Sequence, residues 1–207
     1  EEIGAEARPV GVGHPGSISP RTGLIRNANT TQLNGKPFDR DLAAAIGRPV
    51  ACANDADCFA LSEATDGAGA HARSVFGVIL GTGVGGGLVI DGRLHGGQDG
   101  NAGEWGHAGL PWPDPDEVPG PACKCGLSGC IEAWCSGPAL SADHERATGQ
   151  ALTGEAIAAL ASDGDAAARA SLDRHAARLA RGLALVVNIA DPEVIVLGGG
   201  LSNLRRL

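Results

Sequence analysis

One histidine and three cysteines constrain this chain more than any other feature. His107 is followed after fifteen residues by Cys123, Lys124 and Cys125, and Cys130 follows after four more. Three thiolates and one imidazole satisfy the tetrahedral coordination of zinc, and four protein ligands leave no open position, so the metal is expected to be structural. The alternative is three free thiols on a loop.

The cysteine content allows a second arrangement. The 207-residue chain has six cysteines, and its first residues do not resemble a secretory leader. Three disulfides would suit a short secreted chain, whereas a metal cluster with three separate thiols is favoured here. We expect the remaining cysteines to be small buried hydrophobic residues. They are Cys52, Cys58 and Cys135.

Composition excludes several classes of protein. Hydrophobic residues make up 43% of the chain and charged residues 19%, which excludes a disordered chain. No apolar run approaches the length of a membrane-spanning helix, so we expect no membrane association. The net charge of −8 argues against a nucleic-acid partner, which would require a basic face. An anionic substrate would therefore need backbone N–H groups, a metal ion or a few arginines.

The order of apolar runs predicts a mixed-sheet α/β fold, because strands and helices alternate around one tight hairpin. Residues 75–80 and 85–90 form this hairpin, and residues 67–73 are the best domain boundary. Other strands are expected at 10–14, 24–25, 49–53 and 194–197, and helices at 39–46, 55–65, 153–161, 165–189 and from Leu201 onward. Asp39 is the expected N-cap of the first helix.

Asn54 and Asp55 lie between an expected strand and an expected helix. At this edge of an α/β sheet, where ligands collect, a carboxylate can serve as the base that a hydroxyl-phosphorylating kinase needs. The alternative is that Asp55 only caps the helix.

Two glycine-rich segments follow strands, at residues 81–87 and 198–200. Glycine backbone lets phosphates approach closely, and Thr82 adds a hydroxyl donor. The first segment is not a Walker loop, since no Gly-Lys-Ser/Thr follows. Either segment could instead be a tight turn that requires glycine.

Two carboxylates lie beside the expected metal ligands. Glu104 precedes His107 by three residues, and Glu132 follows Cys130 by two. Such acceptors suit the hydroxyl groups of a sugar, but they could equally orient the metal ligands.

These motifs occur in one order along the chain: Asn-Asp at 54–55, the glycine-rich hairpin at 81–87, Glu-Trp-Gly-His at 104–107, the cysteine loop at 123–132 and Val-Ile-Val-Leu-Gly-Gly-Gly at 194–200. In this order they resemble the ROK family (repressors, open reading frames, kinases) of sugar kinases, over essentially the whole chain. The stretches 15–20, 27–29, 33–39 and 103–107 most resemble the bacterial fructokinases of that family.

The resemblance implies an α/β, actin-like (ribonuclease-H-like) two-lobed fold with mixed sheets. Residues 1–68 would be part of a small N-terminal lobe, and residues 69–207 would be a large lobe with the zinc loop. The sugar and ATP would lie in the cleft between them. The family's first phosphate loop, Asp-x-Gly-Gly-Thr, is absent, and a final helix would continue past Leu207. We therefore expect truncation at both ends and poor ATP binding by the chain as given.

The resemblance also assigns roles to residues. Asp55 would be the general base at the sugar 6-hydroxyl, and zinc would act indirectly by fixing the loop that carries Glu104 and Glu132. Mg²⁺ would bridge the ATP phosphates. The sugar would contact Gly16, Asn54, Asp55, Glu104, His107 and Glu132; the nucleotide would contact Thr82, Gly83, Gly198 and Gly199; zinc would bind His107, Cys123, Cys125 and Cys130.

The resemblance predicts an ATP-dependent hexose kinase, with fructose to fructose 6-phosphate as the first choice. A kinase for glucose, mannose or an N-acetylhexosamine is an alternative that keeps the chemistry. A sugar-sensing ROK repressor is an alternative from another class, in which a DNA-binding domain would precede residue 1. We also expect a cytoplasmic homodimer.

Overall fold

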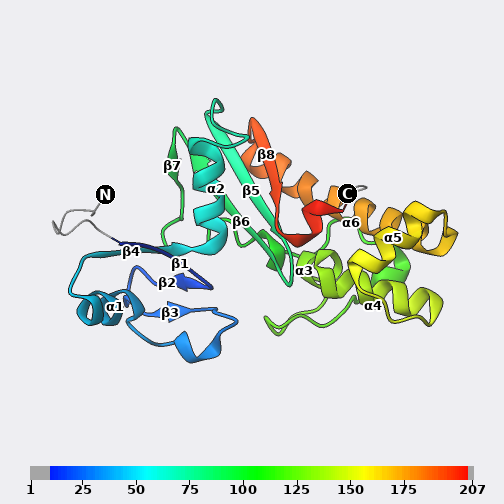
Figure 1. The fold of residues 1–207 in the computed structure, drawn as a ribbon, viewed down its shortest axis with the longest axis horizontal. Helices are drawn as coiled ribbons and strands as arrows, with labels where there is room; N and C mark the ends of the chain where they lie inside the picture. The colour runs from blue at the N-terminus through cyan, green and yellow to red at the C-terminus, as the bar shows by residue number, and fades with distance from the viewer. Residues whose placement is uncertain (1–9, 205–207) are drawn as a thin grey trace, which may run out of the picture.

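The computed structural model describes residues 10–204 (Figure 1). The strands are β1 (Val10–His14), β2 (Ser17–Ile18), β3 (Ile25–Arg26), β4 (Val50–Asn54), β5 (Ser74–Leu80), β6 (Val84–Ile90), β7 (Arg93–Leu94) and β8 (Val194–Gly198). The α-helices are α1 (Phe38–Ile46), α2 (Asp55–Thr65), α3 (Ile131–Cys135), α4 (Gly137–Thr148), α5 (Gly154–Asp163) and α6 (Ala166–Ala190). Within the described residues, no helix is both long and apolar enough to cross a membrane.

The central sheet has the strand order β7-β6-β5-β8 and is mixed, as predicted. Strands β5 and β6 form an antiparallel hairpin, with Ser74 opposite Ile90 and Leu80 opposite Val84. Strand β8 pairs with β5 in parallel. Strands β1 and β4 form a separate parallel pair, and β2 and β3 form a short antiparallel pair beside them.

Helix α2 packs closely on one face of the hairpin because glycines there remove side chains. A Cβ atom at Gly77 would lie 2.7 Å from the Ala60 Cβ atom, and one at Gly87 would lie 2.8 Å from it. Ala60 is fully buried in this contact. The close approach requires glycine on the sheet and a small residue on the helix, and it fixes the position of the first turn of α2.

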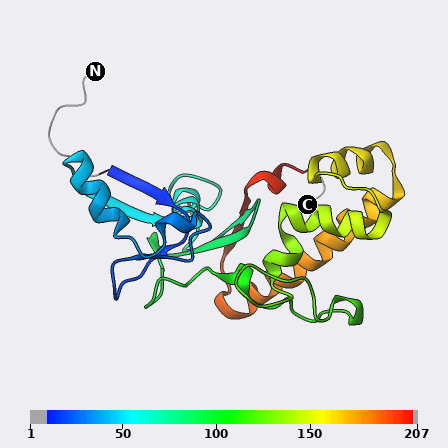
Figure 2. The ribbon, with the colours of Figure 1, turned by 90° about the horizontal axis from the view of Figure 1, so that it is seen from below.

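The opposite face of the hairpin carries the main hydrophobic core. Phe76, Val78 and Leu80 point away from α2 and pack with Ile131 of α3 and Leu179 of α6. Figure 2 shows the resulting elongated arrangement, in which α3–α6 lie at one end of the molecule, β1–β4 and α1 lie at the other, and the hairpin runs between them.

Most of the predicted elements are confirmed, with four corrections. Helix α1 begins at Phe38 after an N-cap at Pro37, so Asp39 lies in the first turn, where its charge favours the helix dipole. Of the three separate cysteines only Cys135 is buried: Cys52 is half-buried, and Cys58 is exposed because it lies on the side of α2 away from the buried Ala56 and Ala60. The helix expected from Leu201 is a single 3₁₀ turn within the described residues. Helices α3 and α4 were not predicted.

A buried ionic network attaches the long loop after His107 to the helical end. The Arg178 guanidinium donates to Glu117 Oε1 at 2.7 Å and to Asp143 Oδ1 at 2.8 Å. It also lies 4.4 Å from the centroid of the Trp134 ring. Glu117 belongs to the loop, Asp143 to α4 and Arg178 to α6, so one cation joins three segments around α3.

Replacing the central cation of this network should destabilise the protein. Arg178→Met leaves two buried carboxylates with fewer partners, and we expect the free energy of unfolding to fall by about 3 kcal/mol. Arg73→Met removes an ion pair whose side chains are 80% and 64% exposed, so its effect should be below about 1 kcal/mol. Urea unfolding followed by circular dichroism measures both; equal losses would contradict the proposed importance of the buried network.

Candidate functional site

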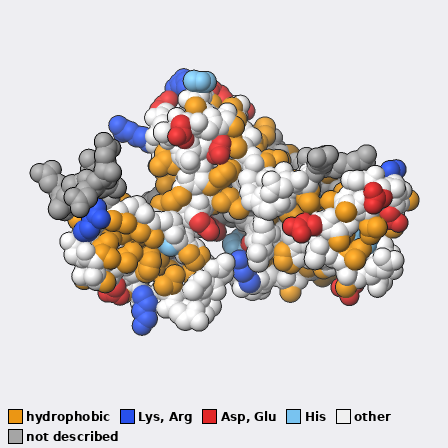
Figure 3. Space-filling view, viewed as in Figure 1, with side chains coloured by type: hydrophobic (Ala, Val, Ile, Leu, Met, Phe, Trp, Pro, Cys, Tyr) orange, Lys and Arg blue, Asp and Glu red, His pale blue; other side chains and the backbone are white. Residues whose placement is uncertain are grey.

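A cavity of about 350 Å³ lies between the tip of the β5–β6 hairpin, the end of β4 and the cysteine loop. In Figure 3, acidic, histidine and basic side chains meet in a hollow between the two ends of the molecule. The structure brings eight of the predicted site residues into the wall of this cavity. They are Gly16, Asn54, Asp55, Thr82, Gly83, Glu104, His107 and Glu132.

Asn54 and Asp55 divide two tasks at the start of α2. The Asn54 Oδ1 atom accepts the Ala56 N–H at 2.9 Å and is the N-cap of the helix, while Asn54 Nδ2 donates to the Gly16 carbonyl at 2.9 Å. Asp55 is the first helical residue and is exposed on the cavity wall. Asn54 therefore has the N-cap position, while the Asp55 Oδ1 atom also accepts the Ala56 N–H at 2.9 Å, so Asp55 both helps to cap the helix and lines the cavity.

Glu132 connects the cysteine loop to the hairpin tip. Its side chain is largely buried, and its Oε2 atom accepts the Val84 N–H at 3.0 Å. Its Oε1 atom lies 3.2 Å from the Lys124 ammonium. A Cβ atom at Gly83 would lie 2.6 Å from Glu132 Oε2, so glycine at this position lets the carboxylate approach the hairpin backbone.

The segment from Gly103 to His107 lies flat against β6 and so positions Glu104. Gly103 has a φ of +94°, and a Cβ atom on Gly106 would lie 2.1 Å from the Val84 carbonyl oxygen. The Trp105 indole N–H donates to the Gly85 carbonyl at 3.0 Å, and its ring packs edge-on against Phe76. These contacts fix the buried Trp105 and Gly106, and the residues on either side of them in the sequence, Glu104 and His107, both lie at the cavity wall.

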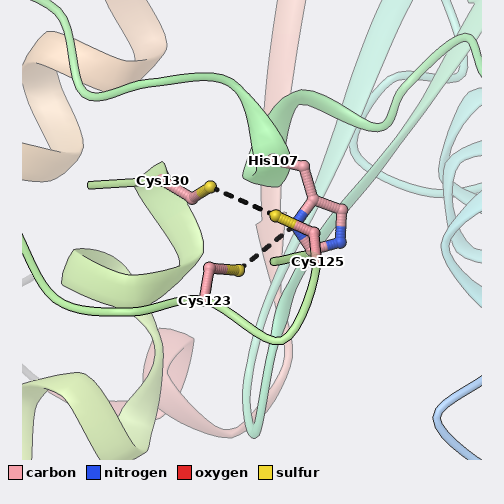
Figure 4. Close-up of side chains that lie close together, drawn as sticks. All are labelled: His107, Cys123, Cys125 and Cys130. Carbon is pink, nitrogen blue, oxygen red and sulfur yellow. Dashed lines mark hydrogen bonds between the residues drawn. The ribbon is translucent and has the colours of Figure 1, made fainter. Parts of the chain in front are cut away.

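The four predicted metal ligands converge. Their donor atoms all lie within 4.8 Å of one another (Figure 4). The Cys123 Sγ atom is 3.5 Å from His107 Nδ1, and the Cys125 Sγ atom is 3.6 Å from Cys130 Sγ. Tetrahedral zinc, with Zn–S near about 2.3 Å and Zn–N near about 2.1 Å, requires edges of roughly 3.5–3.8 Å. The residues therefore fit zinc, and none of the six cysteines is in a disulfide.

The local environment also favours a cation at the centre of this cluster. Burial, with smaller contributions from the neighbouring Cys125 and Cys123 thiols, raises the pKa of the Cys130 thiol to about 12. A thiolate in such a place needs a positive charge beside it, which a divalent metal supplies. Because Nδ1 of His107 faces the thiols, the other ring nitrogen is left on the far side of the ring, and the ring itself lines the cavity.

Gly198 and Gly199 do not line this cavity, and packing alone requires them to be glycine. A Cβ atom at Gly198 would lie 2.5 Å from the Phe59 ring, and one at Gly199 would lie 2.4 Å from the Leu80 carbonyl oxygen. Gly199 also has a φ of +85°. The contact with an adenosine remains a prediction, while the tight turn is observed.

Three polar or charged side chains in the cavity wall were not predicted as site residues. Asn27 and Asn29 reach the wall from the loop after β3, and Lys124 reaches it from between two metal ligands. The positive φ of 57° at Asn27 is a conformation that asparagine tolerates better than most residues. The paired asparagines were a visible signal, but nothing in the sequence placed the loop opposite Asp55.

Asp57 forms an acidic group with the site carboxylates. Burial, with smaller contributions from the charges of Glu104 and Asp55, raises the pKa of Asp57 to about 6. Its Oδ1 atom is buried and has no hydrogen-bond partner among the described residues. Asp57 therefore loses its proton only above about pH 6, and its charged form at neutral pH costs free energy in this site.

The contribution of Asp57 to stability should consequently fall as the pH rises from about 4 to about 6, because the folded protein holds the Asp57 proton more tightly than the unfolded chain. Asp57→Asn removes this titration. We expect the melting temperature of Asp57→Asn minus that of the natural protein to be larger at about pH 7.5 than at about pH 4. Asp173→Asn, at an exposed position on α6, is the control. A difference independent of pH would contradict the role of Asp57.

Known proteins share this architecture. The chain superimposes on a ROK hexokinase from Thermus thermophilus with a TM-score of 0.80 and 38% identity, over 94% of this chain and 63% of that one. It matches a ROK family glucokinase from Streptomyces griseus, solved with glucose and AMPPNP, with a TM-score of 0.79 and 30% identity, over 97% of this chain and 68% of that one. The fold is therefore the predicted actin-like, ribonuclease-H-like fold of sugar kinases with mixed sheets.

The sequence comparisons agree. The model of the ROK family matches residues 2–207. An N-acetyl-D-glucosamine kinase from Pasteurella multocida (strain Pm70) is 40% identical over 203 residues, which cover 96% of this chain and 67% of that protein. The chain belongs to the ROK family. It spans about two thirds of the length of these relatives.

Proposed function

We propose that this chain is the sugar-binding and base-carrying part of an ATP-dependent hexose kinase. The observation that carries the proposal is the exposed Asp55 carboxylate, which shares a cavity with Asn54, Glu104, Glu132 and the tip of a glycine-rich hairpin. Acceptor groups from three separate segments suit the several hydroxyl groups of a sugar. Membership of a family that includes ATP-dependent sugar kinases supports the same assignment.

In the proposed reaction, Asp55 accepts the proton of the sugar 6-hydroxyl as that oxygen bonds to the γ-phosphorus of ATP. The bond from the γ-phosphorus to the bridging oxygen breaks, and ADP leaves with the electron pair. Asn54 holds the backbone of Gly16 and the start of α2, so it positions the base. Thr82 and Gly83 face the phosphates, and bound Mg²⁺ would neutralise phosphate charge.

We also propose that the cluster of His107 and three cysteines binds one zinc ion. Its role is structural, because all four positions around the ion are filled by protein. The bound ion would fix the loop that carries Lys124 and the start of α3, and with it Glu132. His107 would then hold zinc through Nδ1 and meet the sugar through its other nitrogen.

Two observations favour different hexoses as the substrate. The sequence stretches 15–20, 27–29, 33–39 and 103–107 favour fructose, whereas the relative with 40% identity is named an N-acetyl-D-glucosamine kinase. We propose N-acetyl-D-glucosamine as the first substrate to test, with fructose, glucose and mannose as the competing sugars. A coupled ADP-release assay over these sugars, with the complete natural protein, decides among them.

Asp55→Asn should abolish most of the phosphoryl transfer. We expect kcat to fall by about 10²–10⁴-fold, the usual contribution of a general base, while sugar binding measured by calorimetry persists. Asp66→Asn, at the end of the same helix and outside the cavity, is the matched control. Near-normal kcat in Asp55→Asn would remove Asp55 from this role.

The same assay tests the alternative from another class. A natural protein that binds a hexose and transfers no phosphoryl group would favour the sugar-sensing repressor over the kinase. The cytoplasmic location, the homodimer and the lobe boundary at residue 68 stay predictions based on the resemblance.

Cys125→Ser should release the zinc. Metal analysis of the natural protein should give about one zinc per chain, and the variant should lose it together with most of its sugar affinity. Cys58→Ser replaces an exposed thiol outside the cluster and should keep both. Full sugar affinity in a zinc-free variant would contradict the scaffold role of the metal.

A further inference from the structure

A second cavity, of about 400 Å³, adjoins the sugar cavity on the side of α4. The two cavities share part of their walls and meet at the tip of the β5–β6 hairpin. The residues that line both are Asn29, Thr82, Gly83, Lys124 and Glu132. The second cavity continues along Ala133, Ser136 and the first turn of α4. Asp55 lines only the first cavity, so the base and the second cavity lie on opposite sides of the shared wall.

Lys124 stands at the junction. Among the described residues that line either cavity, it is the only lysine or arginine. Its ammonium lies 3.2 Å from Glu132 Oε1 and 3.7 Å from the position of a Cβ atom on Gly83. The side chain is 55% exposed, so water and ligands reach it. Its backbone lies between the metal ligands Cys123 and Cys125, so the flexible side chain extends from a fixed part of the loop.

The charge balance around Lys124 is unfavourable to a phosphate. Asp55, Glu104 and Glu132 all line the sugar cavity, and the chain as a whole has a net charge of −8. A phosphoryl group moving from the second cavity to a sugar in the first must pass these carboxylates. A cation at the shared wall would offset their repulsion at the point where charge develops.

We propose that Lys124 is a catalytic residue that contacts the transferring phosphoryl group. This inference rests on the proposed function. With sugar alone, Lys124 pairs with Glu132. When the phosphate donor occupies the second cavity, the ammonium moves to oxygens of the γ-phosphoryl group. Glu132 keeps the Val84 N–H as a partner and becomes free to accept from a sugar hydroxyl.

The transfer itself is unchanged by this assignment. The sugar oxygen bonds to the γ-phosphorus, the bond to the bridging oxygen breaks, ADP leaves with the electron pair, and Asp55 takes the hydroxyl proton. Lys124 contributes charge and forms no covalent bond. The second cavity is therefore assigned to the phosphate chain of the donor, next to the positive end of α4.

The chain offers a matched control, because Lys36 is its only other lysine. Lys36 is exposed and lies outside both cavities. In the complete natural protein, Lys124→Met should lower kcat by about 10²-fold, a typical loss for one donor at a developing charge. The affinity for AMPPNP with Mg²⁺, measured by calorimetry with saturating sugar, should fall as well. Lys36→Met should change neither, and Lys124→Arg should restore part of both.

Three readouts separate the possible failures. Zinc content equal to that of the natural protein shows that Lys124→Met has kept the metal loop. If Lys124→Met raises only the KM for the sugar and leaves kcat and AMPPNP affinity unchanged, Lys124 merely orients Glu132 and the inference is overturned. If the natural protein phosphorylates no hexose, the proposed function fails instead; an active natural protein with a fully active Lys124→Met overturns this inference alone.

Discussion

The site depends on how closely α2 can approach the β5–β6 hairpin. Ala60 rests on Gly77 and Gly87, where any side chain on the sheet would collide with the helix. This contact sets the height of the helix above the sheet and therefore the place where Asn54 and Asp55 emerge. A larger residue on the helix or on the sheet would push α2 away from the hairpin and move the Asp55 carboxylate away from the cavity. The position of Asp55 therefore depends on the lack of side chains at Gly77 and Gly87.

A second constraint acts from the other face of the hairpin. Trp105 lies over Gly86, and Glu132 reaches the backbone beside Gly83. The hairpin is thus held between α2 on one side and the segments next to the metal ligands on the other. Through Glu117, the buried Arg178 fixes the loop between His107 and Cys123 to α6. The cavity is consequently assembled from distant segments whose positions depend on one sheet and one ionic network.

The sequence predicted what short-range patterns encode. The strands at 75–80 and 85–90, the helix at 55–65 and the convergence of His107 with three cysteines were all visible as periodicity or spacing. The sequence did not predict α3, which is short, and α4 was missed although Ser136 as N-cap and Pro138 in the first turn are signals of a helix start. Nor could it separate the glycines that pack from those that face the cavity, because that distinction depends on α2 and Trp105, which lie far away in sequence.

Asn27, Asn29 and Lys124 were missed as site residues for a related reason. Each is an ordinary surface type of residue in a loop, and only the tertiary arrangement places it opposite Asp55. The exposed Cys58 was misjudged because burial of a small thiol depends on which side of α2 it occupies. Metal ligands are easier to predict, since their chemistry restricts both residue type and spacing.

The two-sided packing of the hairpin has a consequence for how such a site can diversify. Gly77, Gly86 and Gly87 cannot acquire side chains without disturbing α2 or Trp105, so the strands of the hairpin offer little variation to selection. Changes in sugar preference must come from loops that approach from outside, such as the one carrying Asn27 and Asn29. The hairpin would then be the constant part of the site, whereas loops that tolerate substitution would determine which sugar binds.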